Sequence, residues 1–96
     1  MSLVSEVIAR SCVVTGRVQG VGFRWWAKQV AEELGIAGWV RNSADGRVEL
    51  MVQGSEDLVD VFVAKLAGGP PMAAVEDVRL VEAVPELALS EFSIRG

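Results

Sequence analysis

Three glycines and two arginines are concentrated in one nine-residue stretch, Gly16-Arg-Val-Gln-Gly-Val-Gly-Phe-Arg24. The stretch follows a run of β-branched residues and precedes an amphipathic segment, an order typical of a strand, a loop and a helix. Glycine permits the backbone torsions of a tight loop, and the unpaired N–H groups at a helix N-terminus attract anions. Because Arg17 and Arg24 add positive charge on either side, these residues predict an anion site, most simply for a phosphate group.

The side chains beside the loop have more than one interpretation. Arg24 would begin the helix, and its guanidinium could reach back over the loop to hold two phosphate oxygens at once. Arg17 is as consistent with a solvated surface charge as with a ligand. Trp26 is expected to pack against the sheet, whereas Trp25 could pack at the margin of the sheet or border a substrate pocket.

Residue types exclude several kinds of catalysis. The chain has no histidine and a single cysteine, Cys12, which is expected to be a small buried side chain in a strand. Zinc and iron–sulfur sites therefore lack ligands, and a Ser-His or Cys-His pair cannot form. Asp45 and Glu49 are most simply solvated charges. The chemistry that remains is electrostatic and positional, which suits phosphoryl transfer, and neither a metal nor another cofactor is expected.

Length and charge limit the possible partners. Ninety-six residues predict a single domain, residues 1–96. The net charge is −4, and only the first fifty residues, with six basic and five acidic side chains, carry a positive excess. This balance argues against nucleic acid as a partner but permits one small anion. The N-terminus lacks the pattern of a signal peptide and no stretch could span a bilayer, so we expect no membrane partner and a cytoplasmic location.

The elements that must position the loop follow a simple order. Strands are predicted at 7–15, 36–43, 47–53 and 75–84, with a short edge strand at 90–95. The first helix runs from Phe23 to Leu34, and the second begins near Ser55 with an apolar stripe of Leu58, Val61, Phe62 and Leu66. This order predicts an α+β, ferredoxin-like βαββαβ sandwich: an antiparallel sheet with two helices on one face and a short C-terminal edge strand. The glycine-rich loop would then join the first strand to the first helix.

Motifs along nearly the whole chain resemble the acylphosphatase family. They are Gly16-Arg-Val-Gln-Gly-Val-Gly-Phe-Arg24, Gly38-Trp-Val-Arg-Asn42, Asp45-Gly46-x-Val48-Glu49, Gly69-Pro70 and the ending Phe92-Ser-Ile-Arg95. The resemblance implies hydrolysis of acyl phosphates to a carboxylate and inorganic phosphate, without a metal or a phosphoenzyme. It also implies a small-molecule acyl phosphate as substrate, inorganic phosphate as product and competitive inhibitor, and a monomer.

The resemblance assigns roles to individual residues. Arg24 would bind the phosphoryl group and Asn42 would orient the attacking water. From its position alone, at the end of a strand before a turn, Asn42 would be attributed to turn geometry. The phosphate-binding loop would comprise Arg17, Val18, Gln19, Gly20, Val21, Gly22 and Phe23.

Three alternatives remain beside this interpretation. The first is a non-catalytic ferredoxin-like module that binds an anion or a partner protein. The second is a domain like the N-terminal one of hydrogenase-maturation carbamoyltransferases, although this chain has its own start and terminal strand and no following zinc-finger cysteines. The third is an RNA-binding domain of the same topology, which would need exposed aromatic residues and a basic sheet that this sequence does not show.

Overall fold

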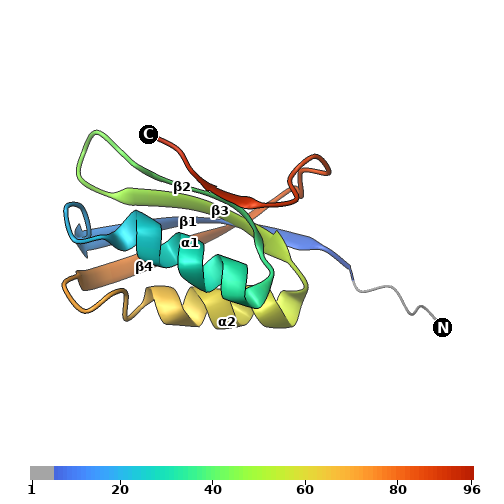
Figure 1. Ribbon diagram of the computed structural model, residues 1–96, viewed down its shortest axis with the longest axis horizontal. Coiled ribbons are helices and arrows are strands. Elements are labelled where there is room, and N and C mark those ends of the chain that lie inside the picture. Colours follow the sequence, from blue (N-terminus) through green and yellow to red (C-terminus); the bar gives the residue numbers. More distant parts are fainter. Residues whose placement is uncertain (1–5) are drawn as a thin grey trace.

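The computed structural model describes residues 6–96, which form five strands and two helices (Figure 1). Each strand and the first helix begin and end within two residues of their expected boundaries, and the second helix begins one residue after Ser55. Among these residues, no helix is long and apolar enough to cross a membrane. In chain order the elements are β1 (Ile8–Arg17), α1 (Phe23–Leu34), β2 (Ala37–Asn42), β3 (Val48–Gly54), α2 (Glu56–Leu66), β4 (Ala74–Ala83) and β5 (Phe92–Ile94).

The strands form one sheet in the order β4-β1-β3-β2-β5. The first four are antiparallel to their neighbours, as expected, but β5 pairs parallel to β2. The reason lies in the chain direction: β4 ends at the end of the sheet where β2 begins. The connection crosses that end, so β5 starts beside the start of β2 and runs the same way. The sheet as a whole is therefore mixed.

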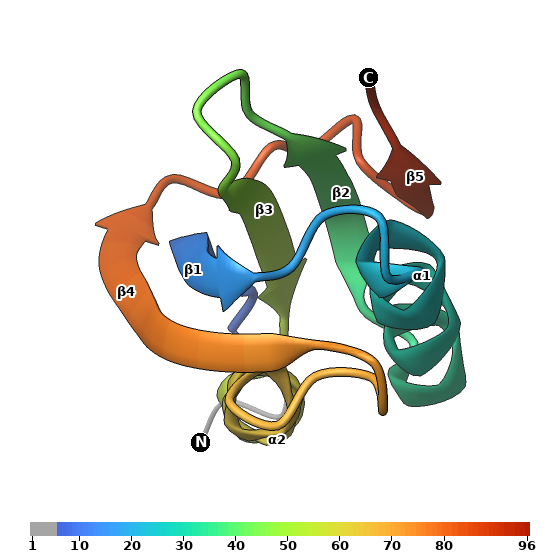
Figure 2. The same ribbon diagram turned by 90° about the vertical axis from the view of Figure 1, so that its left-hand side faces the viewer.

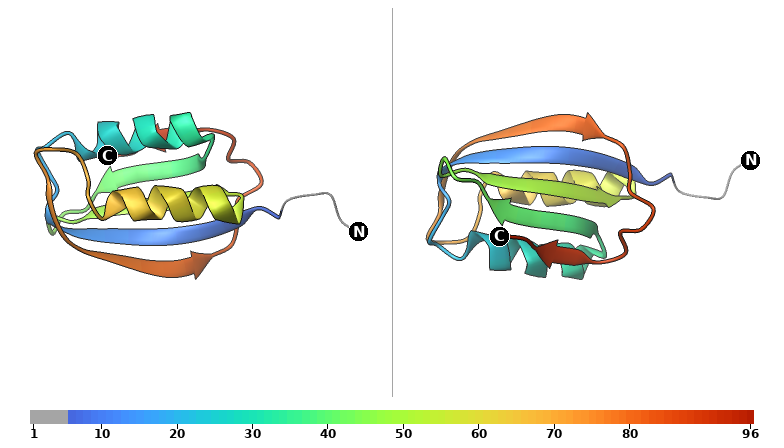
Figure 3. Two further views of the ribbon diagram at one scale, coloured as in Figure 1. Left: turned by 90° about the horizontal axis from the view of Figure 1, so that it is seen from below. Right: turned by 90° about the horizontal axis from the view of Figure 1, so that it is seen from above.

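Both helices cover the same face of the sheet (Figure 3). Helix α1 buries Phe23, Ala27 and Ala31 against it. In α2 the buried residues are Val59, Phe62 and Leu66, whereas Leu58 and Val61 are 38% and 43% exposed. The expected stripe was thus wrong at these two positions. Apolar residues extend around much of α2, so several faces satisfied helical spacing, and packing on the sheet selects one of them.

A buried polar side chain fixes the connection between β4 and β5. Gln53 is 6% exposed, and it is the one buried polar side chain found in residues 6–96. Its Oε1 accepts a hydrogen bond from Glu86 N at 2.8 Å, and its Nε2 donates to Glu86 O at 2.9 Å. The connection is therefore held to the sheet, which places β5 beside β2.

The C-terminal ends of β1, β2 and β5 lie at the same end of the sheet as the start of α1. Figure 2 looks onto this end, where the chain passes from β1 across the end of β2 to reach α1. Arg95 N donates to Val40 O at 2.8 Å, which keeps the last residues of the chain alongside β2. The fold thus brings the glycine-rich loop, the end of β2 and the C-terminus together.

Candidate active site

The loop between β1 and α1 owes its path to two glycines in the left-handed region. Gly20 has φ 72° and Gly22 has φ 77°. No atom lies within 4 Å of where a Cβ would stand on either residue, so glycine is required by the torsion and not by space. Gly22 also caps α1, since its carbonyl accepts a hydrogen bond from Trp26 N at 3.0 Å.

The N–H groups of this loop are available to a ligand. Outside the helices and strands, the backbone hydrogen bonds of the described chain include none donated by residues 19–22. These donors lie immediately before the N-terminus of α1, where the helix dipole adds about half a positive charge. The arrangement suits an anion such as a phosphate group.

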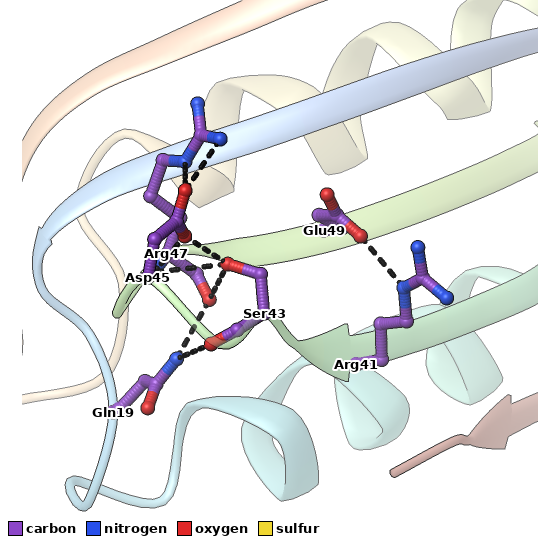
Figure 4. A network of polar contacts seen from close by, with 6 residues as sticks. All are labelled: Gln19, Arg41, Ser43, Asp45, Arg47 and Glu49. Atoms are coloured by element: carbon purple, nitrogen blue, oxygen red, sulfur yellow. Dashed lines mark hydrogen bonds and ion pairs between the residues drawn. The ribbon is translucent and has the colours of Figure 1, made fainter.

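Gln19 joins the loop to the hairpin between β2 and β3 (Figure 4). Its Nε2 donates to Ser43 O at 2.8 Å and to Arg47 O at 2.9 Å. Both acceptors belong to the turn that follows Asn42, so the two segments are fixed relative to each other. Because the side chain of Gln19 points toward the turn, only the backbone of Gln19 remains to contact a ligand in the site.

The hairpin turn has its own polar network (Figure 4). Arg47 Nε donates to Asp45 Oδ2 at 2.8 Å, and Ser43 Oγ donates to the other oxygen of the same carboxylate. These two hydrogen bonds hold the pKa of Asp45 well below its usual range, and the bond from Arg47 has the larger effect. Glu49 on β3 forms an ion pair with Arg41 on β2, with 2.6 Å between Glu49 Oε1 and Arg41 Nε. Both carboxylates are thus bound to arginines, and neither lines the pocket described next.

A cavity of about 200 Å³ opens between the loop, β2, α1 and β5. It brings together Arg24, Asn42 and part of the predicted loop, while Arg17, Gln19 and Val21 do not line it. Arg17 is exposed at the end of β1. The residues that line the cavity are Val18, Gly20, Gly22, Phe23, Arg24, Trp25, Asn42 and Ile94.

Asn42, which lines this cavity, has a side-chain acceptor without a partner within residues 6–96. It is the last residue of β2. Its side chain lies on the same face of the strand as that of Val40, which is fully buried beneath the helices. Its Oδ1 is buried and has no hydrogen-bond partner within residues 6–96. A buried amide oxygen without a partner is unfavourable unless a bound molecule donates to it. This geometry offers an acceptor for a water or a ligand O–H.

Arg24 is held by the C-terminal residue of the chain. Its Nη1 donates to the main-chain oxygen of Gly96 at 2.8 Å. Neither Gly96 nor Ile94 was expected at the site. The alternation of Phe92 and Ile94 could have placed Ile94 on the helix-facing side of the sheet, but no sequence signal points to the contact with Gly96.

The structure also shows the surroundings of Trp25, Trp26 and Cys12. Trp26 packs edge-on against Phe23, with 5.3 Å between ring centroids, whereas Trp25 is 61% exposed. Cys12 is buried, as expected. Within residues 6–96, no three His, Cys, Asp or Glu side chains cluster in a way that could hold a metal.

Comparison with known proteins gives the family. The family model described as Acylphosphatase matches residues 10–94. The chain belongs to the acylphosphatase family. An acylphosphatase of Koribacter versatilis is 47% identical over 87 residues, which cover 91% of this chain and 79% of the relative.

Solved structures agree with this assignment. The acylphosphatase of Bacillus subtilis superposes with a TM-score of 0.88 at 37% identity, covering 93% of this chain and 99% of that one. Full-length HypF, solved in a phosphate- and nucleotide-bound form, superposes with a TM-score of 0.84 at 25% identity, but the match covers only 13% of HypF. The acylphosphatase family and fold confirm the resemblance seen in the sequence, and they support an enzyme that hydrolyses acyl phosphates.

Proposed function

We propose that this acylphosphatase cleaves the carboxyl–phosphate bond of small acyl phosphates in the cavity at the end of β1 and β2. The observation that carries the proposal is the convergence of three groups on one cavity of about 200 Å³: the glycine-rich loop, Arg24 and the unpartnered Oδ1 of Asn42. The first two groups favour an anion, and the third favours a molecule that donates a hydrogen bond.

The phosphoryl group would be held by the backbone of residues 17–23 together with Arg24. A guanidinium has five N–H donors, and the main-chain oxygen of Gly96 takes one of them. The remaining donors can bind two phosphoryl oxygens in the paired geometry that suits arginine. Loop N–H groups and the helix dipole then stabilise the charge that spreads over these oxygens in the transition state.

Asn42 would place the nucleophile. If its Oδ1 accepts a hydrogen bond from water, a lone pair of that water is free to attack phosphorus in line with the departing carboxylate. A new P–O bond forms, the bond between phosphorus and the carboxyl oxygen breaks, and the carboxylate leaves with that electron pair. The side chains that line the cavity include no base that titrates near neutrality, so the proton of the water passes to a phosphoryl oxygen.

The same lining supports hydrolysis in a single step without a metal. It contains no serine, threonine, cysteine or carboxylate side chain. A covalent phosphoenzyme would need a nucleophilic side chain in this place, and a divalent cation would need oxygen or nitrogen ligands beyond one amide. Direct attack by water remains the mechanism that these residues support.

The experiment is a hydrolysis assay of the purified protein. Benzoyl phosphate and acetyl phosphate are incubated with the enzyme, with and without EDTA, and the loss of acyl phosphate is followed. We expect turnover that EDTA does not change and that inorganic phosphate inhibits competitively. If neither compound is hydrolysed, the protein is an anion-binding module instead. Loss of activity in EDTA would refute the metal-free mechanism.

The setting of the enzyme is part of the proposal. We place it in the cytoplasm as a monomer, with residues 1–96 forming one domain. The buried, unpaired Cys12 is compatible with a reducing compartment. Neither nucleic acid nor a membrane is needed as a partner, since the cavity accounts for a small anionic substrate.

A further inference from the structure

Two exposed apolar side chains line the cavity. Trp25 is 61% exposed and Ile94 is 40% exposed. The other apolar side chains of the lining, Val18 and Phe23, are only 1% and 2% exposed. The cavity therefore has a buried apolar floor and a solvent-exposed apolar mouth.

The fold itself does not require Trp25. Its neighbour Trp26 supplies the packing against Phe23 that helix α1 needs. Other large apolar side chains are exposed in residues 6–96, for example Val84 and Leu87, but they do not line this cavity. An indole in solvent at the edge of a binding site, beside a second exposed apolar side chain, is typical of a surface that a ligand covers.

Trp25 and Ile94 come from two facing walls. Trp25 is in the first turn of α1, and Ile94 is the last residue of β5. Figure 2 shows α1 and β5 next to each other at the end of the sheet where the loop lies. The hydrogen bond from Arg24 Nη1 to the main-chain oxygen of Gly96, 2.8 Å long, joins the same two walls one or two residues away. A polar contact therefore joins the two segments that carry the apolar side chains.

We propose that Trp25 and Ile94 bind the acyl group of the substrate and make the enzyme select aromatic and branched apolar acyl phosphates. The inference rests on the proposed function, because a phosphoryl group held by the loop and Arg24 must extend its acyl group out through the mouth. An aromatic acyl group gains stacking area on the indole. Arg24 is the one charged side chain in the lining and binds the phosphoryl group, so a charged acyl group loses hydration without gaining a partner.

The test compares kcat/KM for benzoyl phosphate and acetyl phosphate. In Trp25→Ala we expect the benzoyl-to-acetyl ratio of kcat/KM to fall roughly tenfold, mainly through a higher KM for benzoyl phosphate. Trp25→Phe should keep most of the ratio, because it keeps an aromatic face. Ile94→Ala should lower the ratio by about threefold, since it removes a smaller area.

A matched control separates a specific effect from a general one. Leu87→Ala removes a fully exposed leucine (101% relative exposure) that lies outside the cavity, so its activity and its ratio should equal those of the wild type. A ratio in Trp25→Ala that matches the wild type would overturn this inference and leave the proposed function intact. Failure of the wild type to hydrolyse either compound would overturn both.

Discussion

Arg24 already has a partner inside the protein before any substrate binds. One of its N–H groups donates to the main-chain oxygen of Gly96, and this contact orients a side chain that is otherwise long and flexible. Asn42 is the opposite case, since its buried Oδ1 has no partner in residues 6–96. One residue is thus oriented by the fold, and the other offers an unused acceptor. The two should respond differently to substitution.

Arg24→Lys should remove most of the activity while leaving the fold intact. A lysine is a point charge on a flexible stem, so it cannot bind Gly96 and two phosphoryl oxygens in parallel. We expect kcat/KM to fall by about a hundredfold or more, which is roughly 2.7 kcal/mol of transition-state stabilisation. Kinetics with benzoyl phosphate and urea unfolding would measure the two effects. A lysine variant with activity within threefold of the wild type would contradict the bidentate role.

Asn42→Ala should lower kcat far more than it weakens phosphate binding. If Asn42 orients water, its loss slows the attack on phosphorus and leaves the affinity for phosphate unchanged. We therefore expect kcat to fall by about a hundredfold. Stability should be unchanged or slightly higher, because the substitution removes a buried acceptor that lacks a partner. The inhibition constant for inorganic phosphate provides the comparison. A large rise in that constant with little change in kcat would reassign Asn42 to binding.

The sequence allowed part of this site to be predicted. Arg24 and Asn42 stand in motifs with family-specific spacing, and both line the cavity. Ile94 and Gly96 were not foreseen because they reach the site through β5, a three-residue strand placed by the Gln53 contacts. Contacts between segments so far apart in sequence depend on tertiary packing, which local spacing does not encode.

At the scale of elements, the positions of the strands and helices were predictable, but the buried face of a helix and the direction of strand pairing were less so. The β2–β3 hairpin and α1 follow from turn residues and from helical spacing. The buried face of α2 did not, because Leu58 and Val61 fit the same period as the residues that pack on the sheet. The parallel pairing of β5 also escaped prediction, since it depends on how the connection after β4 crosses the sheet.

The two hydrogen bonds from Gln19 to Ser43 and Arg47 form the joint between the loop and the hairpin, and substitution of Gln19 tests it. Gln19→Ala removes two hydrogen bonds, of 2.8 and 2.9 Å, and leaves the carbonyls of Ser43 and Arg47 without them. We expect the free energy of unfolding to fall by about 1–2 kcal/mol, and kcat/KM to fall by roughly tenfold as the loop and Asn42 lose their fixed relation.

Gln29→Ala is the matched control, because Gln29 is exposed on α1. It makes the same chemical change away from the joint, so both stability and activity should remain close to wild type. Equal effects of the two substitutions would show that the joint between the loop and the hairpin does not matter.

At the scale of the whole molecule, the fold separates its one thiol from solvent and from the site. Cys12 lies in β1 with 1% of its surface exposed, and its side chain is part of the core beneath the helices. Burial raises the pKa of this thiol to about 12, although Arg10 partly opposes the shift. The thiol is therefore protonated at neutral pH, and Cys12 does not line the cavity.

The raised pKa predicts how stability depends on alkaline pH. Between about pH 9 and 12 the thiol is ionised in the unfolded chain but protonated in the folded one, so the folded state binds more protons. The contribution of Cys12 to stability is therefore complete below pH 9 and is lost as pH rises toward 12. The slope can reach about 1.4 kcal/mol per pH unit. The chain has no tyrosine, and its only lysines are Lys28 and Lys65.

Cys12→Ala isolates this effect. It should be less stable than the wild type near pH 8, because a small cavity replaces the sulfur, yet its stability should fall much less between pH 8 and 10.5. Urea unfolding followed by tryptophan fluorescence at the two pH values gives both slopes. Parallel slopes for the two proteins would mean that Cys12 ionises as easily in the folded state as in the unfolded chain, and that the core at β1 admits water.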